Sequence, residues 1–75
     1  MIINLSARPR ERIVKYLQER YRKTGVNAPV LWRTIWIELS LTEDEISKAL
    51  QAAAEQSDIV FVDRDHIKLG PNGLE

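Results

Sequence analysis

The sequence contains no cysteine, and this absence excludes disulfide bonds, thiolate zinc sites and cysteine nucleophiles together. It also contains no apolar run longer than four residues, so no segment is long enough to span a membrane. Residues 1–5 lack both a basic leader and an apolar stretch of signal-peptide length. These absences fit the reducing cytoplasm, which is where we expect the protein.

Motifs for catalysis are missing too. The chain has no Ser–His–Asp spacing, no phosphate-binding glycine loop and no secluded pair of carboxylates. His66 is the only histidine, and although Asp63 and Asp65 are close to it, these three side chains on one tight turn do not readily converge on a metal ion. We therefore expect no enzymatic activity, no cofactor and no small-molecule substrate.

The chain has no net charge, but its charges are unevenly distributed. Residues 1–37 hold eight basic and two acidic residues, giving +6, whereas residues 38–75 hold three and nine, giving −6. Two opposed halves of this kind can orient a charged partner or a second copy of the chain.

The balance of 44% apolar and 29% charged residues is typical of a globular protein, and 75 residues allow one small domain. We expect an N-terminal arm at 1–5 and a domain at 6–70. Residues 71–75 follow the start of a Gly-Pro-Asn-Gly cluster and are expected to be a tail or linker.

Two helices are predicted in the first half of the chain. The first lies between Ser6, a candidate N-cap, and Gly25, which suits a left-handed C-cap. The second begins at an Asn27 cap with Pro29 in its first turn, after a short extended link at 26–28 that can make one isolated strand pairing. Their expected apolar faces are Ile13, Val14, Leu17 and Tyr21 in the first helix, and Leu31, Ile35 and Leu39 in the second.

A third helix and a hairpin are predicted in the second half. Thr42 and Glu45 have the spacing of a capping box, which starts a helix that runs to about Gln56. Residues 59–62 and 66–69 have strand patterns on either side of a turn at 63–65. The expected buried face of the third helix is Ile46, Ala49, Leu50 and Ala53.

Two helices joined by a short break and followed by a hairpin resemble the winged helix-turn-helix superfamily, and the resemblance runs from Leu31 to Leu69. It implies an α+β fold, in which a three-helix bundle with a helix-turn-helix is followed by a two-stranded β-hairpin wing. In DNA-binding members the third helix enters the major groove, so the resemblance makes DNA a candidate partner.

The outward side chains of the third helix give evidence both for and against DNA binding. Ser47, Lys48 and Gln51 are suited to contacting base edges. The same helix, however, has four carboxylates against one lysine, which disfavours docking on phosphates. The capping box by itself also accounts for the acidic residues at 43–45.

The first helix has the opposite charge. Its cations fall within about a quarter-turn, interrupted by Glu19 and flanked by Tyr16, which can stack on a base. This face is either a solvated surface or a binding surface for a phosphate backbone or an acidic partner. Its candidate nucleic-acid contacts are Arg8, Arg12, Lys15, Arg22 and Lys23.

Trp32 and Trp36 are one helical turn apart. They belong either to the core or, with Ile37, to an exposed apolar patch at a dimer or partner interface. Two functions therefore remain open. One is a regulatory nucleic-acid-binding module; the other is a protein-interaction or dimerisation module that uses the tryptophans and the opposed charges.

Overall fold

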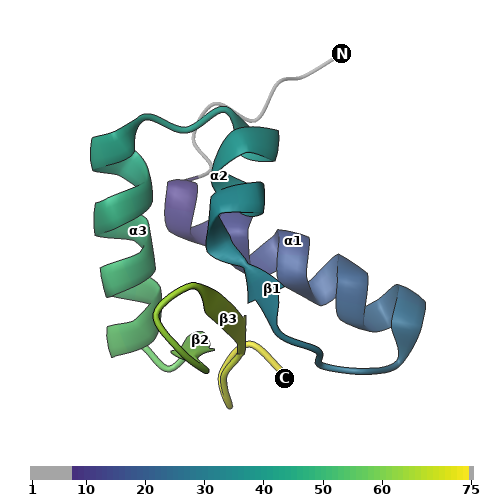
Figure 1. The fold of residues 1–75 in the computed structure, drawn as a ribbon. Helices are drawn as coiled ribbons and strands as arrows, with labels where there is room; N and C mark the ends of the chain where they lie inside the picture. Colours follow the sequence, from purple (N-terminus) through teal and green to yellow (C-terminus); the bar gives the residue numbers. More distant parts are fainter. Residues whose placement is uncertain (1–7, 75) are drawn as a thin grey trace.

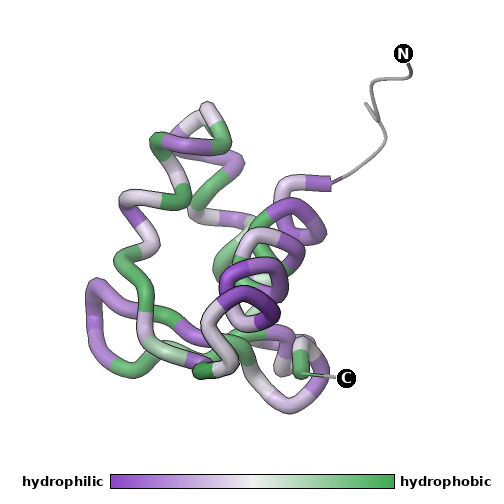
Figure 2. Tube along the Cα trace, turned by 90° about the vertical axis from the view of Figure 1, so that its right-hand side faces the viewer, coloured by the Kyte–Doolittle hydropathy of each residue, from purple (hydrophilic) through white to green (hydrophobic). Residues whose placement is uncertain are grey.

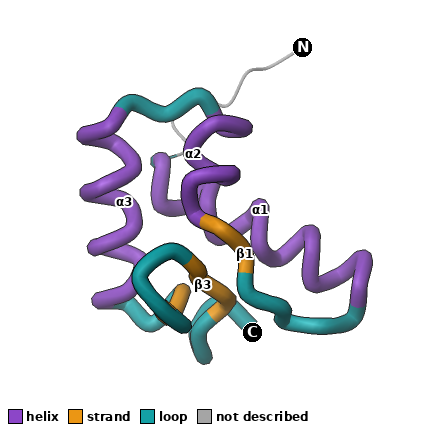
Figure 3. The backbone as a smooth tube through the Cα atoms, in the orientation of Figure 1, coloured by secondary structure: helices purple, strands orange, loops and turns teal. Residues whose placement is uncertain are grey.

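The computed structural model describes residues 8–74 and combines three helices with a three-stranded antiparallel sheet (Figures 1 and 3). The predicted α+β class is confirmed. In chain order the elements are α1 (Pro9–Thr24), β1 (Val30–Leu31), α2 (Trp32–Leu39), α3 (Glu43–Glu55), β2 (Ile59–Phe61) and β3 (His66–Leu69).

The sheet has one strand more than the predicted hairpin. Its order is β1-β3-β2, so β3 lies in the centre and pairs antiparallel with both neighbours. β1 is only two residues long, with Val30 opposite Ile67 and Leu31 opposite His66. The isolated strand pairing expected at 26–28 is wrong in position, since it forms at Val30–Leu31, beyond Pro29.

α1 begins and ends as its residue types require, with Pro9 in its first turn. Gly25 has a φ of 73°, and its N–H donates to the Tyr21 carbonyl at 2.7 Å. The predicted left-handed cap is confirmed, since this conformation disfavours any residue with a Cβ. At the other end Arg8 occupies the N-cap position without a side-chain bond. The expected Ser6 cap lies outside the described residues.

The expected start of the second helix is wrong. Asn27 does not cap it; its amide donates to the Leu69 carbonyl at 2.9 Å and accepts from the Leu69 N–H at 3.0 Å. Because an amide is both donor and acceptor, Asn27 satisfies the two backbone groups of the last residue of β3. Pro29 consequently precedes β1, and α2 begins only at Trp32.

The predicted capping box of α3 is confirmed. Thr42 Oγ1 accepts from the Glu45 N–H at 3.1 Å, and Glu45 Oε1 accepts from the Thr42 N–H at 2.8 Å. Ser40, in the left-handed region with a φ of 54°, turns the chain between α2 and α3.

The core lies between the helices and the inner face of the sheet. The predicted buried face of α3 is confirmed, and its alanines let α1 pack closely against it. Two expected core residues are wrong, because Tyr21 is 39% and Leu31 is 44% exposed. Leu31 belongs to β1, where alternation along the strand turns it outward. Most of α1 is drawn in the hydrophilic colour (Figure 2), which matches its mostly exposed surface.

Residues 71–74, expected to be a tail or linker, form a turn packed on the domain. The Gly70 N–H donates to the Asp58 carbonyl at 2.9 Å, and Gln18 Nε2 of α1 donates to the Gly73 carbonyl at 3.0 Å. A Cβ at Gly73 would collide with the Asp58 carbonyl, so glycine allows this close approach.

Replacing Thr42 by alanine removes the hydroxyl that accepts the Glu45 N–H, so we expect the free energy of unfolding to fall by about 1 kcal/mol. Thr34→Ala is the matched control, because Thr34 is exposed within α2 and alanine favours helix more than threonine does. Urea unfolding followed by circular dichroism measures both variants. Unchanged stability of Thr42→Ala would contradict the role of the cap.

Candidate functional site

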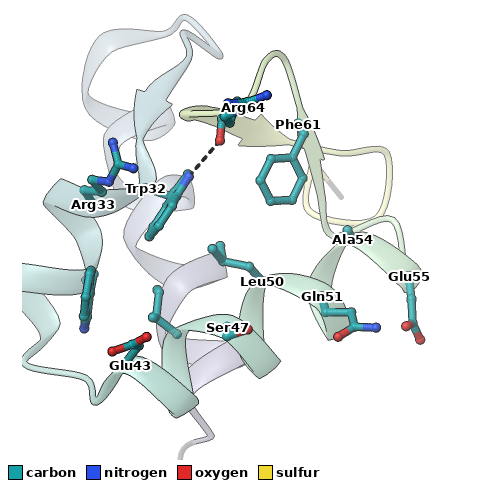
Figure 4. Close-up of a pocket in the computed structure, with 12 residues that line it drawn as sticks. Trp32, Arg33, Glu43, Ser47, Leu50, Gln51, Ala54, Glu55, Phe61 and Arg64 are labelled. Atoms are coloured by element: carbon teal, nitrogen blue, oxygen red, sulfur yellow. Dashed lines mark hydrogen bonds between the residues drawn. The ribbon is translucent and has the colours of Figure 1, made fainter.

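An open cavity of about 800 Å³ lies between α2, α3 and the hairpin β2–β3 (Figure 4). We call it the groove. α2 contributes Trp32, Arg33 and Trp36; α3 contributes Glu43, Ile46, Ser47, Leu50, Gln51, Ala54 and Glu55; and the hairpin contributes Phe61 and Arg64.

The two tryptophans form one wall of the groove. Their rings are stacked, with centroids 6.2 Å apart and an interplanar angle of 27°. Trp32 Nε1 donates to the Arg64 carbonyl at 3.0 Å, and Trp36 Nε1 donates to the Leu41 carbonyl at 2.6 Å. Both rings are therefore fixed by internal bonds, half-buried against the core, and offer carbon surface to the groove.

The three side chains predicted to contact base edges do not share one surface. Ser47 and Gln51 are exposed and line the groove. Lys48 lies outside it, and its Nζ is 3.2 Å from Asp44 Oδ2. Two of the candidates are thus polar groups beside an apolar surface, and the only lysine of α3 is already paired.

The charges around the groove are divided between its walls. Glu43 and Glu55 stand at the two ends of the α3 wall, and neither takes part in the ion pairs formed among residues 8–74. On the opposite side, Arg33 lies 5.1 Å from the Trp32 ring centroid and pairs with Asp65 Oδ1 at 3.1 Å, while Arg64 takes part in no ion pair among residues 8–74. The α3 wall therefore keeps uncompensated negative charge, and the opposite wall keeps the positive charge of Arg64.

The predicted basic face of α1 is exposed. Its cations lie on the side of the helix away from Ile13 and Leu17, and this side contributes nothing to the groove. Arg12 is engaged within the fold, because its Nη2 donates to the Leu39 carbonyl at 2.9 Å. The five side chains are Arg8, Arg12, Lys15, Arg22 and Lys23.

Tyr16, considered above for base stacking, is half-buried and packs against the core. The neighbouring carboxylate of Glu38 accepts its hydroxyl bond, which raises the pKa of Tyr16. Because the ring packs against the core, it is less free to stack on a ligand.

The structure separates Ile37 from the tryptophans with which the sequence grouped it. Its side chain is 75% exposed but does not line the groove. Phe61 takes that place: it is 46% exposed and faces the groove from β2 (Figure 4). Its strand was predicted, but its partnership with the tryptophans depends on how the hairpin packs.

The turn at 63–65 and the adjacent His66 hold no converging metal ligands. His66 Nδ1 lies 2.9 Å from Asp63 Oδ1, and this hydrogen bond lowers the pKa of Asp63. Asp65 is directed to Arg33 instead. Within residues 8–74 no three His, Asp or Glu side chains form a metal-binding group.

In the described part of the chain, none of the helices is long and apolar enough to cross a membrane. Comparison with protein-family models, curated proteins and solved structures finds no match to this chain.

The hydrogen bonds donated by the two indole N–H groups differ in burial, so removing each one should lower the stability by a different amount. Trp36→Phe leaves the partly buried Leu41 carbonyl without its donor, and we expect it to lower the free energy of unfolding by about 2 kcal/mol. Trp32→Phe frees a carbonyl that water can reach, so we expect a loss of about 1 kcal/mol or less. Urea unfolding measures both. A larger loss for Trp32→Phe would contradict this assignment.

Proposed function

We propose that the chain is a winged-helix domain that binds a partner protein in the groove. The element order α1-β1-α2-α3-β2-β3 and the central position of β3 support the fold. In it, α2 and α3 with the link at 40–42 form the helix-turn-helix, and β2 with β3 forms the wing. Because one fold hosts unrelated functions, the choice of partner rests on the groove and not on the fold.

The observation behind the choice is the fixed tryptophan wall. Trp32, Trp36 and Phe61 give the groove an aromatic surface of the kind that dominates binding energy at protein interfaces. Since both indole N–H groups are already bonded inside the domain, an apolar partner leaves no tryptophan donor unsatisfied. The fixed rings also lose little conformational freedom on binding.

The charge of α3 disfavours nucleic acid in the same place. Glu43, Asp44, Glu45 and Glu55 lie on this helix, and Lys48 is paired with one of them. Phosphates approaching α3 would meet net negative charge and release few counterions.

A library of random peptides displayed on phage tests the proposal. We expect selection on the wild-type protein to give peptides whose dissociation constant rises about tenfold or more in Phe61→Glu, because that carboxylate must be desolvated beside an apolar partner. Val62→Glu adds the same charge at the next residue, which is similarly exposed but lies outside the groove, and should leave binding unchanged.

Fluorescence anisotropy measures the dissociation constants, and circular dichroism verifies that both variants fold. The proposal fails if selection gives no binding peptide, or if Phe61→Glu and Val62→Glu bind the selected peptides equally well.

A second candidate function is nucleic-acid binding by α1, and the exposed basic side of that helix favours it. Lys15, Arg22 and Lys23 are exposed and take no part in the ion pairs among the described residues. Cations arranged along one helix side can follow a phosphate backbone without reading its sequence.

If α1 binds DNA with four or five cations, the log–log salt dependence of the association constant should have a slope of about −3 to −4.5. Lys15→Gln with Lys23→Gln should make that slope shallower by about 1.5, whereas Lys48→Gln with Lys68→Gln should not change it. Anisotropy of labelled duplex and single-stranded DNA gives the slopes. Absence of binding to both at low salt excludes this candidate.

A further inference from the structure

The length of the groove limits what fills it. Glu43 and Glu55, the first and last residues of α3, both line it, so the groove runs along the whole helix. At a rise of about 1.5 Å per residue this is about 18 Å, the length of a helix of about 12 residues. An extended segment of about five residues would span the same distance.

The chemistry of the groove distinguishes these two occupants. An extended segment needs partners for its backbone N–H and C=O groups, and the backbone of α3 is already bonded within the helix. The edge strand on this side, β2, is only three residues long and offers little for strand addition. A helix satisfies its own backbone and can present an apolar stripe to the tryptophan wall.

The described helices of this chain cannot supply that stripe to a second copy. α1, α2 and α3 each direct an apolar face into their own core. The large hydrophobic side chains that their outer faces expose are Tyr21 on α1 and Ile37 on α2, and α3 exposes none. An apolar stripe needs several such residues at helical spacing, so none of the described helices of a second copy supplies it.

The charge of the α3 wall indicates what flanks the stripe. Glu43 and Glu55 remain unpaired among the described residues, at both ends of the wall. Ser47 and Gln51 lie between them and offer a hydroxyl and an amide. Complementary charge on the partner means lysine or arginine on the flank that faces α3.

We propose that the groove binds an amphipathic helix of about three turns from another protein, with apolar side chains against Trp32, Trp36 and Phe61 and basic side chains beside Glu43 and Glu55. This inference rests on the proposed function and specifies its partner.

The test uses a phage library of helical peptides with one fixed apolar face and randomised flanks. Selection on the wild-type protein should enrich lysine and arginine on one flank. Proline in the middle of a selected peptide should weaken binding about tenfold or more, because it breaks the helix.

Two double variants of the protein test the charged wall. With Glu43→Gln and Glu55→Lys the dissociation constant of the selected peptides should rise about threefold or more. Glu11→Gln with Glu19→Lys makes the same change of charge on exposed positions of α1 and should have no effect.

The outcomes distinguish a failure of this inference from a failure of the proposed function. Peptides whose binding is lost in Phe61→Glu but that lack a basic flank, or that tolerate proline, overturn this inference and leave the proposed function standing. Selection that gives no peptide sensitive to Phe61→Glu overturns both. A wild-type dimer in sedimentation that Phe61→Glu abolishes overturns the inference as well, since a second copy would then cover the groove.

Discussion

The arrangement of the groove depends on the junction between the start of α2 and the turn at 63–65. The backbone N–H of Trp32 donates to the Asp65 carbonyl at 3.1 Å, and its indole N–H donates to the Arg64 carbonyl at 3.0 Å. Arg33 adds an ion pair to the Asp65 carboxylate at 3.1 Å. The Asp65 carbonyl thus satisfies a first-turn donor of α2. Together the three bonds hold the hairpin turn against the start of α2. Without this junction the aromatic wall and Phe61 would not face a common space.

The junction also explains why so short a strand matters. β1 makes only two residue pairings with β3, yet it delivers the chain to α2 beside the hairpin turn. Asn27 extends the pairing by bonding both backbone groups of Leu69. Side-chain and main-chain bonds together therefore hold a connection that strand length alone would leave weak.

Features set by neighbouring residues were predictable from the sequence. The helical period located the core face of α3 and, except for Tyr21, that of α1, and the spacing of Thr42 and Glu45 located the start of α3. Asn27 was not predictable in this way, because an asparagine before a proline has the local pattern of a helix cap, and its actual partner lies 42 residues away. Leu31 failed for the same reason, since pairing with β3 decides its conformation.

The candidate site, too, was only partly predictable from the sequence. Trp32, Trp36, Ser47 and Gln51 were each singled out by residue type and helical position. The sequence assigned them to two competing surfaces, a nucleic-acid contact and a protein interface. Only the packing of the hairpin against α2 brings them to one groove and adds Phe61. Local patterns contain no information about that packing.

The placement of the tryptophans makes the groove its own spectroscopic reporter. The chain has two tryptophans, and both lie in this wall. All tryptophan emission of the protein therefore originates at the groove, with no background from elsewhere in the domain. Shielding of the rings from water by any occupant would register directly in the wavelength and quenching of that emission, without a label on either molecule.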